Sequence, residues 1–244
     1  MNATLRRETL PEQLAEELLS FIEREELNPG DLLPAATTLA AEYRVSRPVV
    51  REAIRMLEAR GVIRTANGRG AVIQPVSHEL LSQYFSRAVF LRKESHVELL
   101  EVRKGLEMES AFLAATRATD DELRSIDDLV RQLATAVGDA SIYADLDAQL
   151  HLEIAVATHN TMLRYLIESI RVPLKESIEE GLRCRVSFAH HQRIQDLHEG
   201  LARALVDRDP NQASAMMSLH FDEALKAITG VSEGLGHAGQ GVAS

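Results

Sequence analysis

Residues 62–74 carry the pattern that most restricts the fold of this chain. Two short runs containing β-branched residues, 62–66 and 71–74, flank the segment Asn67-Gly68-Arg69-Gly70. Asn-Gly is a strong short-range signal for a β-hairpin, because a type I′ turn needs positive φ at both central residues. The sequence therefore predicts a β-hairpin here, and the segments before the hairpin indicate which fold it belongs to.

Three helical segments precede the hairpin. Apolar residues recur at helical spacing over 11–26, and a short second helix is indicated over 37–43. A third helix opens after Ser46, which is a suitable N-cap, and ends at Gly61. Three helices followed by a hairpin predict a winged helix-turn-helix domain over residues 1–76.

Charge is distributed unevenly along the chain. The net charge of −10 argues against nucleic acid as a partner, because non-specific DNA affinity comes mostly from Lys and Arg. Between residues 44 and 69, however, seven arginines accompany only two glutamates, and most of the acidity lies after residue 76. A basic patch within one unit is typical of a protein that binds DNA on one surface. The alternative is a helix whose arginines are merely solvated.

Several short motifs in residues 11–75 keep one mutual spacing: Leu33-Pro34, Leu39-Ala40, Val45-Ser46-Arg47, Val49-Val50-Arg51-Glu52-Ala53-Ile54, Leu57, Gly61-Val62-Ile63 and Gly68-Arg69-Gly70. With these motifs the first unit resembles the DNA-binding domain of GntR-family regulators. The resemblance implies that double-stranded operator DNA is the partner.

The resemblance also implies which residues contact the operator. Arg47 and Arg51, with Ser46 beside them, lie in the first turns of the recognition helix, and Gly68 and Arg69 form the tip of the wing. The physics agrees, because Arg in the major groove can bind guanine O6 and N7 together, worth about 1–3 kcal/mol of discrimination.

One segment departs from the family pattern. This chain reads Ala35-Ala36-Thr37-Thr38 where the family usually has Ser-Glu-Arg-Glu or a similar sequence. The arginine that normally approaches the operator from the preceding helix is therefore absent. We expect Thr37, Thr38 or Arg44 to offer weaker phosphate contacts in its place; the alternative is a different operator.

The remainder of the chain is predicted to be helical, so the fold class is mainly α. The expected helices, packed as an antiparallel bundle over residues 77–230, cover 79–91, 96–117, 120–137, 140–158, 161–187, 191–208 and 210–229. The Gly-rich segment 231–244 is expected to be a disordered tail. No apolar run is long enough for a membrane span and no leader is evident, so the cytoplasm is the expected compartment.

Three histidines and one aspartate stand out on these helices. Asp147 and His151 are four residues apart and share a face, and His198 and His220 each lie in an apolar stripe of another helix. Burying three imidazoles is costly unless each has a partner, and one divalent cation would satisfy all of them. A mixed nitrogen and oxygen donor set suits Zn, Ni, Mn or Fe. The alternative is a surface Asp–His pair and separately hydrogen-bonded histidines.

The same residues carry a second resemblance. Asp147-Ala148-Gln149-Leu150-His151, then Asn160, His198 and His220, together with Leu100-Glu101-Val102-Arg103 near the start, make residues 97–226 resemble the FCD domain of the FadR branch of GntR regulators. His159 is a departure, because a small residue is more usual there. The resemblance implies a metal held by Asp147, His151, His198 and His220, with zinc the first choice.

The resemblance further implies a small effector that carries a carboxylate, as an organic acid does. Arg103 is the expected carboxylate clamp and Asn160 a second effector contact. An ion pair between Arg103 and Glu107, four residues on, is an equally open interpretation of that arginine.

These patterns predict a homodimeric repressor that releases its operator when the effector binds. Two alternatives stay open at this point. The metal could be purely structural, or the second unit could be a metal-dependent hydrolase or isomerase joined to a DNA-binding domain.

Overall fold

The computed structural model describes residues 8–66, 70–92, 95–137, 139–185 and 188–237. The chain divides after Leu80 into two compact units, a few residues beyond the boundary predicted after Val76. Gly68 and Arg69, the predicted wing tip, lie outside the described residues.

The first unit is a winged helix-turn-helix, as the order of its elements predicts. It consists of α1 (Leu10–Arg24), α2 (Ala36–Glu42), α3 (Arg47–Ala59), β1 (Ile63–Ala66) and β2 (Gly70–Ile73). Helices α1 and α2 both pack against α3. The buried side chains that join them are Leu14, Leu18, Leu39, Val50, Ala53, Leu57, Ile63 and Ile73.

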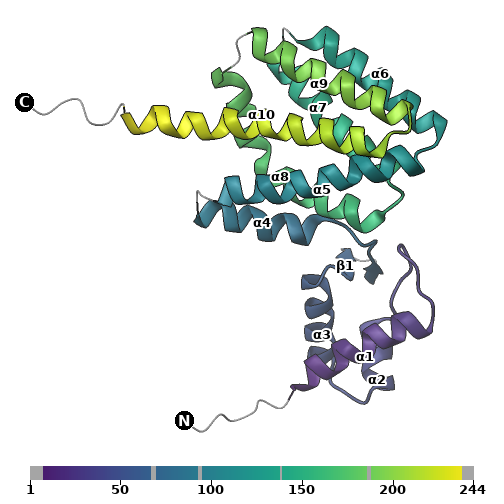
Figure 1. Ribbon diagram of the computed structural model, residues 1–244. Helices are drawn as coiled ribbons and strands as arrows, with labels where there is room; N and C mark the ends of the chain where they lie inside the picture. Colours follow the sequence, from purple (N-terminus) through teal and green to yellow (C-terminus); the bar gives the residue numbers. More distant parts are fainter. Residues whose placement is uncertain (1–7, 67–69, 93–94, 138, 186–187, 238–244) are drawn as a thin grey trace, which may run out of the picture. The chain divides into compact units, whose positions relative to one another are not determined.

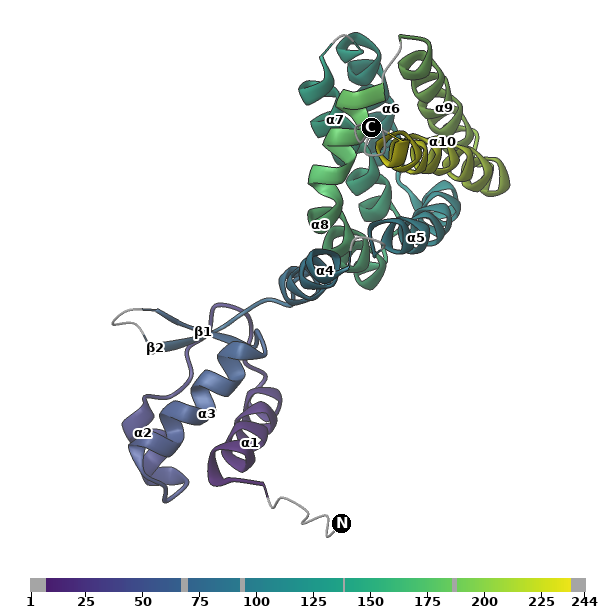
Figure 2. The same cartoon turned by 90° about the vertical axis from the view of Figure 1, so that its left-hand side faces the viewer.

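The wing is an antiparallel hairpin beside α3 (Figure 2). Thr65 of β1 lies opposite Ala71 of β2. The other edge of β2 is also paired, because Leu33 donates its backbone N–H to the carbonyl of Ala71 at 2.9 Å and Leu32 forms a bridge with Val72. Strand β2 is thus bonded along both edges.

The second unit is all-helical within its described residues, which confirms the mainly α fold class. Figure 1 shows its helices, which are α4 (Glu79–Leu91), α5 (Ser95–Arg117), α6 (Asp120–Ala136), α7 (Ala140–Ala157), α8 (Thr161–Arg185), α9 (Phe188–Val206) and α10 (Pro210–His237).

Local sequence signals set the starts of several of these helices. Thr119 and Glu122 form a reciprocal capping box at α6, and the Asp139 carboxylate accepts from two backbone N–H groups at the start of α7. Asp209 caps α10 by accepting from Gln212 N at 3.0 Å.

The core of the second unit lies where α10 crosses α5 and α9 (Figure 1). Helix α7 packs against α6 on one side and α8 on the other, and it also contacts α5. The largest fully buried side chains are Tyr143, Phe221, Leu100, Ile126, Leu133, Leu150, Ile154 and Ile167. Because α5 contacts α7, α9 and α10, side chains from those three helices can converge in the interior beside it.

The predicted tail is partly wrong, because α10 continues to His237. Ile228, Val231 and Leu235 keep the helical spacing of apolar residues past Gly230. A glycine costs about 1 kcal/mol relative to alanine inside a helix, which weakens the helix without ending it. Residues 238–244 lie outside the described residues. Within the described part of the chain, no helix combines the length and apolar character needed to cross a membrane.

Candidate functional site

The four predicted metal donors come together in the second unit. Asp147 and His151 come from α7, His198 from α9 and His220 from α10. One donor atom from each residue lies within 4.8 Å of the donor atoms of the other three. The geometry matches the predicted donor set, and we call these four residues the donor cluster.

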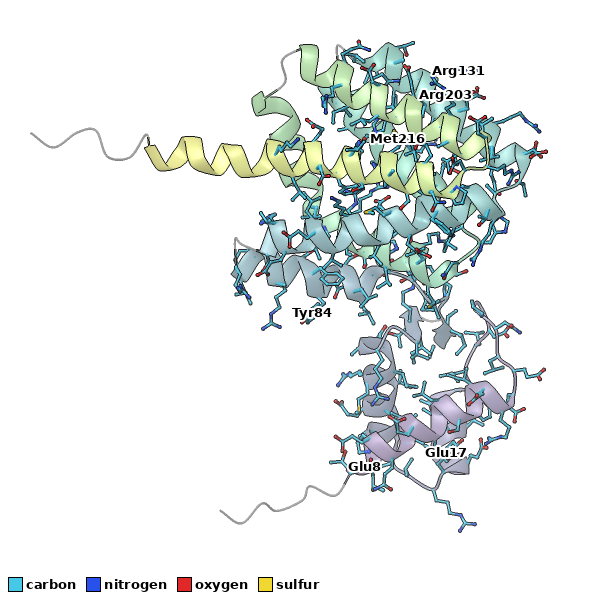
Figure 3. The ribbon with its side chains drawn as sticks, viewed as in Figure 1. Glu8, Glu17, Tyr84, Arg131, Arg203 and Met216 are labelled. Carbon is cyan, nitrogen blue, oxygen red and sulfur yellow. The ribbon has the colours of Figure 1, made fainter. Side chains whose placement is uncertain are left out.

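Distances within the donor cluster are short. His151 Nε2 lies 3.1 Å from His220 Nε2, and His198 Nε2 lies 3.3 Å from Asp147 Oδ1. The His198 and His220 rings are 4.6 Å apart between centroids. Helices α9 and α10 can bring them this close because Gly200 of α9 has no side chain. A Cβ at this position would lie only 2.9 Å from the sulfur of Met216 on α10 (Figure 3).

Burial and mutual contacts set the protonation states of the donor cluster. The histidines are 7% exposed or less, and the Asp147 side chain is 17% exposed. Burial alone would raise the pKa of Asp147, but the nearby histidines, His198 foremost, hold that pKa below its ordinary value. Burial, reinforced by His198 and His151, holds the pKa of His220 well below its ordinary value. At neutral pH a carboxylate therefore faces an unprotonated imidazole, which are the forms that bind metal ions.

Glu107 orients one of the donors. Its Oε2 lies 2.7 Å from His151 Nδ1, and its Oε1 accepts from Arg103 Nε at 2.8 Å. Burial raises the pKa of Glu107, but His151 and Arg103 outweigh burial and hold the pKa below its ordinary value. A carboxylate that accepts a hydrogen bond from Nδ1–H leaves the Nε2 lone pair free to face the donor cluster, which is the usual arrangement of metal-binding histidines.

Tyr143 stands in the same relation to His198. Its hydroxyl lies 3.3 Å from His198 Nδ1. Burial raises the pKa of Tyr143, so the group is a neutral phenol whose oxygen can accept a hydrogen bond from the Nδ1–H of His198.

Two ring nitrogens in the cluster have no hydrogen-bond partner. These are His198 Nε2 and His220 Nδ1, both fully buried. Buried nitrogens without a hydrogen bond are costly, and His198 Nε2 has only the contact with Asp147 Oδ1 at 3.3 Å; a cation between the two could bind both atoms. The donor set, its protonation states and this vacant lone pair all fit a divalent metal ion.

Arg103 is buried beside the cluster, 3% exposed. It makes the ion pair with Glu107 that the spacing allowed, and its guanidinium lies over the Phe221 ring at 5.2 Å. Its role as a carboxylate clamp stays a prediction. Arg171, on α8, was not among the predicted residues. It donates to the Ala148 carbonyl at 2.6 Å, and its pKa is lowered by burial and by the charge of Arg103.

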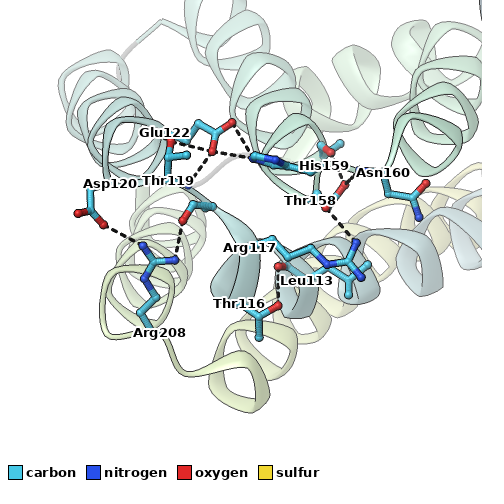
Figure 4. Close-up of polar contacts among 12 residues, drawn as sticks. Leu113, Thr116, Arg117, Thr119, Asp120, Glu122, Thr158, His159, Asn160 and Arg208 are labelled. Atoms are coloured by element: carbon cyan, nitrogen blue, oxygen red, sulfur yellow. Dashed lines mark hydrogen bonds and ion pairs between the residues drawn. The ribbon is translucent and has the colours of Figure 1, made fainter.

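Asn160 lies apart from the donor cluster. Its side-chain oxygen accepts from Leu163 N at 3.2 Å and caps the start of α8, and the residue is exposed. Figure 4 shows Asn160 beside Thr158 and His159. Its predicted effector contact therefore stays a prediction. His159, the departure from the family pattern, adopts φ of 54° and lies 3.0 Å from a carboxylate oxygen of Glu122. This pairing gives the unusual histidine a structural partner.

The residues predicted to contact DNA are exposed on the first unit. Arg47 and Arg51 lie on the first two turns of α3, and Thr37 lies on α2. Ser46 takes the N-cap position, but its side chain makes no capping hydrogen bond. DNA contact by these residues is a prediction that their exposure permits.

Sequence patterns did not reveal three neighbours of the donor cluster. Glu107 lies 44 residues before His151, and nothing in its own helix links the two. No sequence motif indicates that Arg171 lies near the donor cluster. Tyr143 was within reach, because it precedes Asp147 by one helical turn and so shares its face.

Comparison with known proteins bears on the whole chain. The model of the FCD domain matches residues 98–223, and the model of bacterial regulatory proteins of the gntR family matches residues 10–73. The two matches fall on the second and first units respectively.

Curated relatives match over nearly their full length. The chain is 31% identical over 215 residues to the HTH-type transcriptional regulator LutR of Bacillus subtilis, covering 87% of this chain and 98% of that protein. It is 30% identical to the Exu regulon transcriptional regulator of Escherichia coli, covering 87% and 82%. It is 28% identical to the HTH-type transcriptional repressor NanR of Cronobacter sakazakii, covering 94% and 89%.

A solved structure agrees with these matches. Streptococcus agalactiae GntR superposes with a TM-score of 0.69 at 26% identity, covering 89% of this chain and 99% of that one. The relatives are regulators, so the chain is not a metal-dependent hydrolase or isomerase joined to a DNA-binding domain. This chain belongs to the GntR family of bacterial regulatory proteins, in the group whose second domain is an FCD domain, and is a transcriptional regulator.

Proposed function

We propose that this protein is a cytoplasmic, homodimeric repressor whose affinity for operator DNA is controlled by a small carboxylate bound at a metal ion. Asp147, His151, His198 and His220 would hold the ion. When bound, the ion supplies positive charge and open coordination positions for an anionic oxygen. Zinc is our first choice of metal, with Ni, Mn and Fe as alternatives for this donor set.

The observation that carries the proposal is the convergence of four buried donors from three helices. Three imidazoles packed this closely, one with an unpartnered Nε2, are unfavourable in the absence of a cation. Glu107 and Tyr143 support the same function, because each can hold a histidine in the tautomer that a metal needs.

The charges around the cluster favour an anionic effector. Asp147 and Glu107 carry two negative charges, which Arg103 and Arg171 nearby can balance. A divalent ion would add two positive charges to this balanced and largely buried set. Buried charge without a counterion is costly, so an anion such as a carboxylate is the ligand that the site would prefer.

An apolar face on α4 supports the proposed homodimer. Leu81, Tyr84 and Leu91 recur at helical spacing and are 40%, 70% and 67% exposed. Tyr84 is labelled on α4 in Figure 3. Adjacent large apolar side chains are seldom left in water unless a partner covers them. We expect Tyr84→Glu to shift the protein toward monomer in light scattering, whereas Glu101→Gln leaves the dimer intact.

The first experiment is a thermal-shift screen of organic acids, sugar acids and amino acids against metal-loaded and chelated protein. We expect an acid that raises the unfolding temperature only when metal is present. Metal that stabilises the protein with no acid effect would instead support a purely structural ion. No effect of metal at all would overturn the proposed site.

The second experiment connects the site to DNA. Binding to a duplex selected by the protein from a random pool is measured with metal, with and without the acid found in the screen. Relatives named as repressors, such as NanR of Cronobacter sakazakii, lead us to expect weaker DNA binding with the acid. Identical affinity in both conditions would remove effector control from the proposal.

A further inference from the structure

Glu58 joins the last turns of α3 to the wing. Its Oε1 accepts two hydrogen bonds from Thr65 of β1, one from the backbone N–H at 2.8 Å and one from the hydroxyl at 2.7 Å. These bonds tie a carboxylate on the helix that carries Arg47 and Arg51 to a strand of the hairpin.

The two strands of the wing are held differently. On the edge that faces away from β1, β2 pairs with the segment 31–33. On β1, Ile63 is buried at the base, while Arg64 and Thr65 are exposed. A two-stranded hairpin of four-residue strands is marginally stable by itself. The bonds to Glu58 satisfy a backbone N–H that faces away from β2 and fix the strand close to the wing turn.

The position of Glu58 is electrostatically unfavourable for DNA binding. Its carboxylate lines a surface hollow together with Arg51, Arg55, Thr65 and Gly70. The backbone and hydroxyl hydrogen bonds from Thr65 hold the pKa of Glu58 below its ordinary value, so the group is ionised at neutral pH. A negative charge among DNA-facing arginines lowers affinity for phosphates. A carboxylate at this place therefore needs a compensating role in DNA binding, which its two hydrogen bonds to Thr65 can supply.

We propose that Glu58 is a positioning residue for DNA recognition, which locks β1 onto α3 so that the recognition helix and the wing engage DNA as one rigid surface. The proposal concerns the first unit alone and does not depend on the metal or the effector.

The direction in which Glu58→Ala changes DNA affinity distinguishes a positioning role from a purely electrostatic one. Removing a carboxylate near DNA strengthens binding by reducing repulsion, so Glu58→Ala should tighten binding if the residue only contributes charge. If Glu58 anchors the wing, the same substitution weakens binding, on the order of tenfold, because the wing is no longer pre-organised. The affinity of the full-length protein for its selected duplex is measured by fluorescence anisotropy.

Glu52→Ala is the matched control. Glu52 lies on the same helix and is exposed, but its hydrogen bond is to Arg55 of α3 rather than to the wing. We expect unchanged or tighter binding for this variant. Glu58→Gln keeps an oxygen that can accept from Thr65 and removes the negative charge, so it should bind at least as tightly as the wild type.

A double variant tests whether Glu58 acts through the wing. In a background that carries Arg69→Ala, at the predicted wing tip, we expect Glu58→Ala to cost less than about twofold in affinity. Circular dichroism and the unfolding temperature establish that each variant is folded. Should Glu58→Ala fail to fold, Thr65→Val removes only the hydroxyl bond and replaces it in the same comparison.

Two results would overturn the proposal. One is a Glu58→Ala protein that binds DNA as tightly as Glu52→Ala. The other is an equal loss of affinity with and without Arg69→Ala, which would mean that Glu58 does not act through the wing.

Discussion

At the scale of single residues, the geometry of the donor cluster depends on side chains outside the four donors. His151 can present Nε2 only while Glu107 holds its Nδ1 proton, and Glu107 stays ionised in a buried position because Arg103 and His151 flank it. The order of these contacts runs from the arginine to the carboxylate to the donor. A change at any of the three should alter metal affinity.

We therefore expect Glu107→Gln to weaken zinc binding by about 10–100-fold, the usual effect of losing an orienting carboxylate. The dissociation constant is measured by competition with a chromophoric chelator. Glu101→Gln, an exposed residue on the same helix, is the control and should leave the constant unchanged. Equal constants for the two variants would show that Glu107 does not support the site.

At Arg44, backbone strain and a predicted phosphate contact have opposite effects on stability and DNA binding. Its φ of 53° lies in the left-handed region, which costs an L-residue roughly 1–2 kcal/mol. Arg44→Gly relieves this strain, but glycine loses more chain entropy on folding, which offsets part of the gain. We therefore expect the variant to stabilise the first unit by up to about 1 kcal/mol. If Arg44 contacts a phosphate, DNA affinity falls and the salt dependence of log affinity drops by about 0.9.

Glu26→Gly is the control for this change. Glu26 has φ of 51°, is exposed and lies outside the basic patch, so the variant should gain stability without loss of DNA binding. Thermal unfolding and anisotropy at several salt concentrations check both variants. Equal DNA binding by Arg44→Gly and wild type would exclude the phosphate contact.

At the scale of elements, the start of α6 and the turn between α7 and α8 are joined through Glu122 (Figure 4). The hydrogen bond to His159, followed by those from Thr119, lowers the pKa of Glu122 despite partial burial. A carboxyl whose pKa is lower in the folded state stabilises the protein above its unfolded pKa. This contribution is lost as the pH falls through the folded pKa.

We expect wild-type protein to unfold at a higher temperature than Glu122→Gln at pH 7, with the difference shrinking below a pH of about 4.5. Glu153→Gln, on the neighbouring helix α7, is the control variant. A difference between wild type and Glu122→Gln that stays constant down to pH 3 would contradict the assigned interaction.

The elements also show what a sequence can and cannot predict. Helix starts follow local rules, so Thr119 with Glu122 and Asp209 before Pro210 correctly marked α6 and α10. The predicted end of α10 is wrong, because the apolar spacing continues the helix through a glycine-rich segment. The donor set was predictable as residue types in apolar stripes, whereas Glu107 beside His151 results from packing between helices 44 residues apart.

At the scale of the whole molecule, two units with separate cores imply separate unfolding behaviour. A ligand that binds only the folded form of one unit stabilises that unit by about 2.7 kcal/mol when it is a hundredfold above its dissociation constant. The donor cluster lies entirely within residues 81–244.

We expect calorimetry to show that zinc raises the unfolding temperature of the second unit and that chelation lowers it, while the transition of the first unit stays in place. The first unit is identified by the Arg44→Gly variant, which shifts only that transition. An Asp147→Asn protein should lose most of the zinc effect. Equal shifts of both transitions would indicate binding of zinc elsewhere.

The spread of the donors along the chain has a consequence for biosynthesis. His220 follows His151 by 69 residues and belongs to the last helix. Since domains generally fold as they leave the ribosome, N-terminal first, the winged unit is complete while α10 is still being translated. A newly made regulator therefore acquires its winged fold before His220 can join the other three donors, and truncation upstream of residue 220 would yield a protein that lacks its full set of donors.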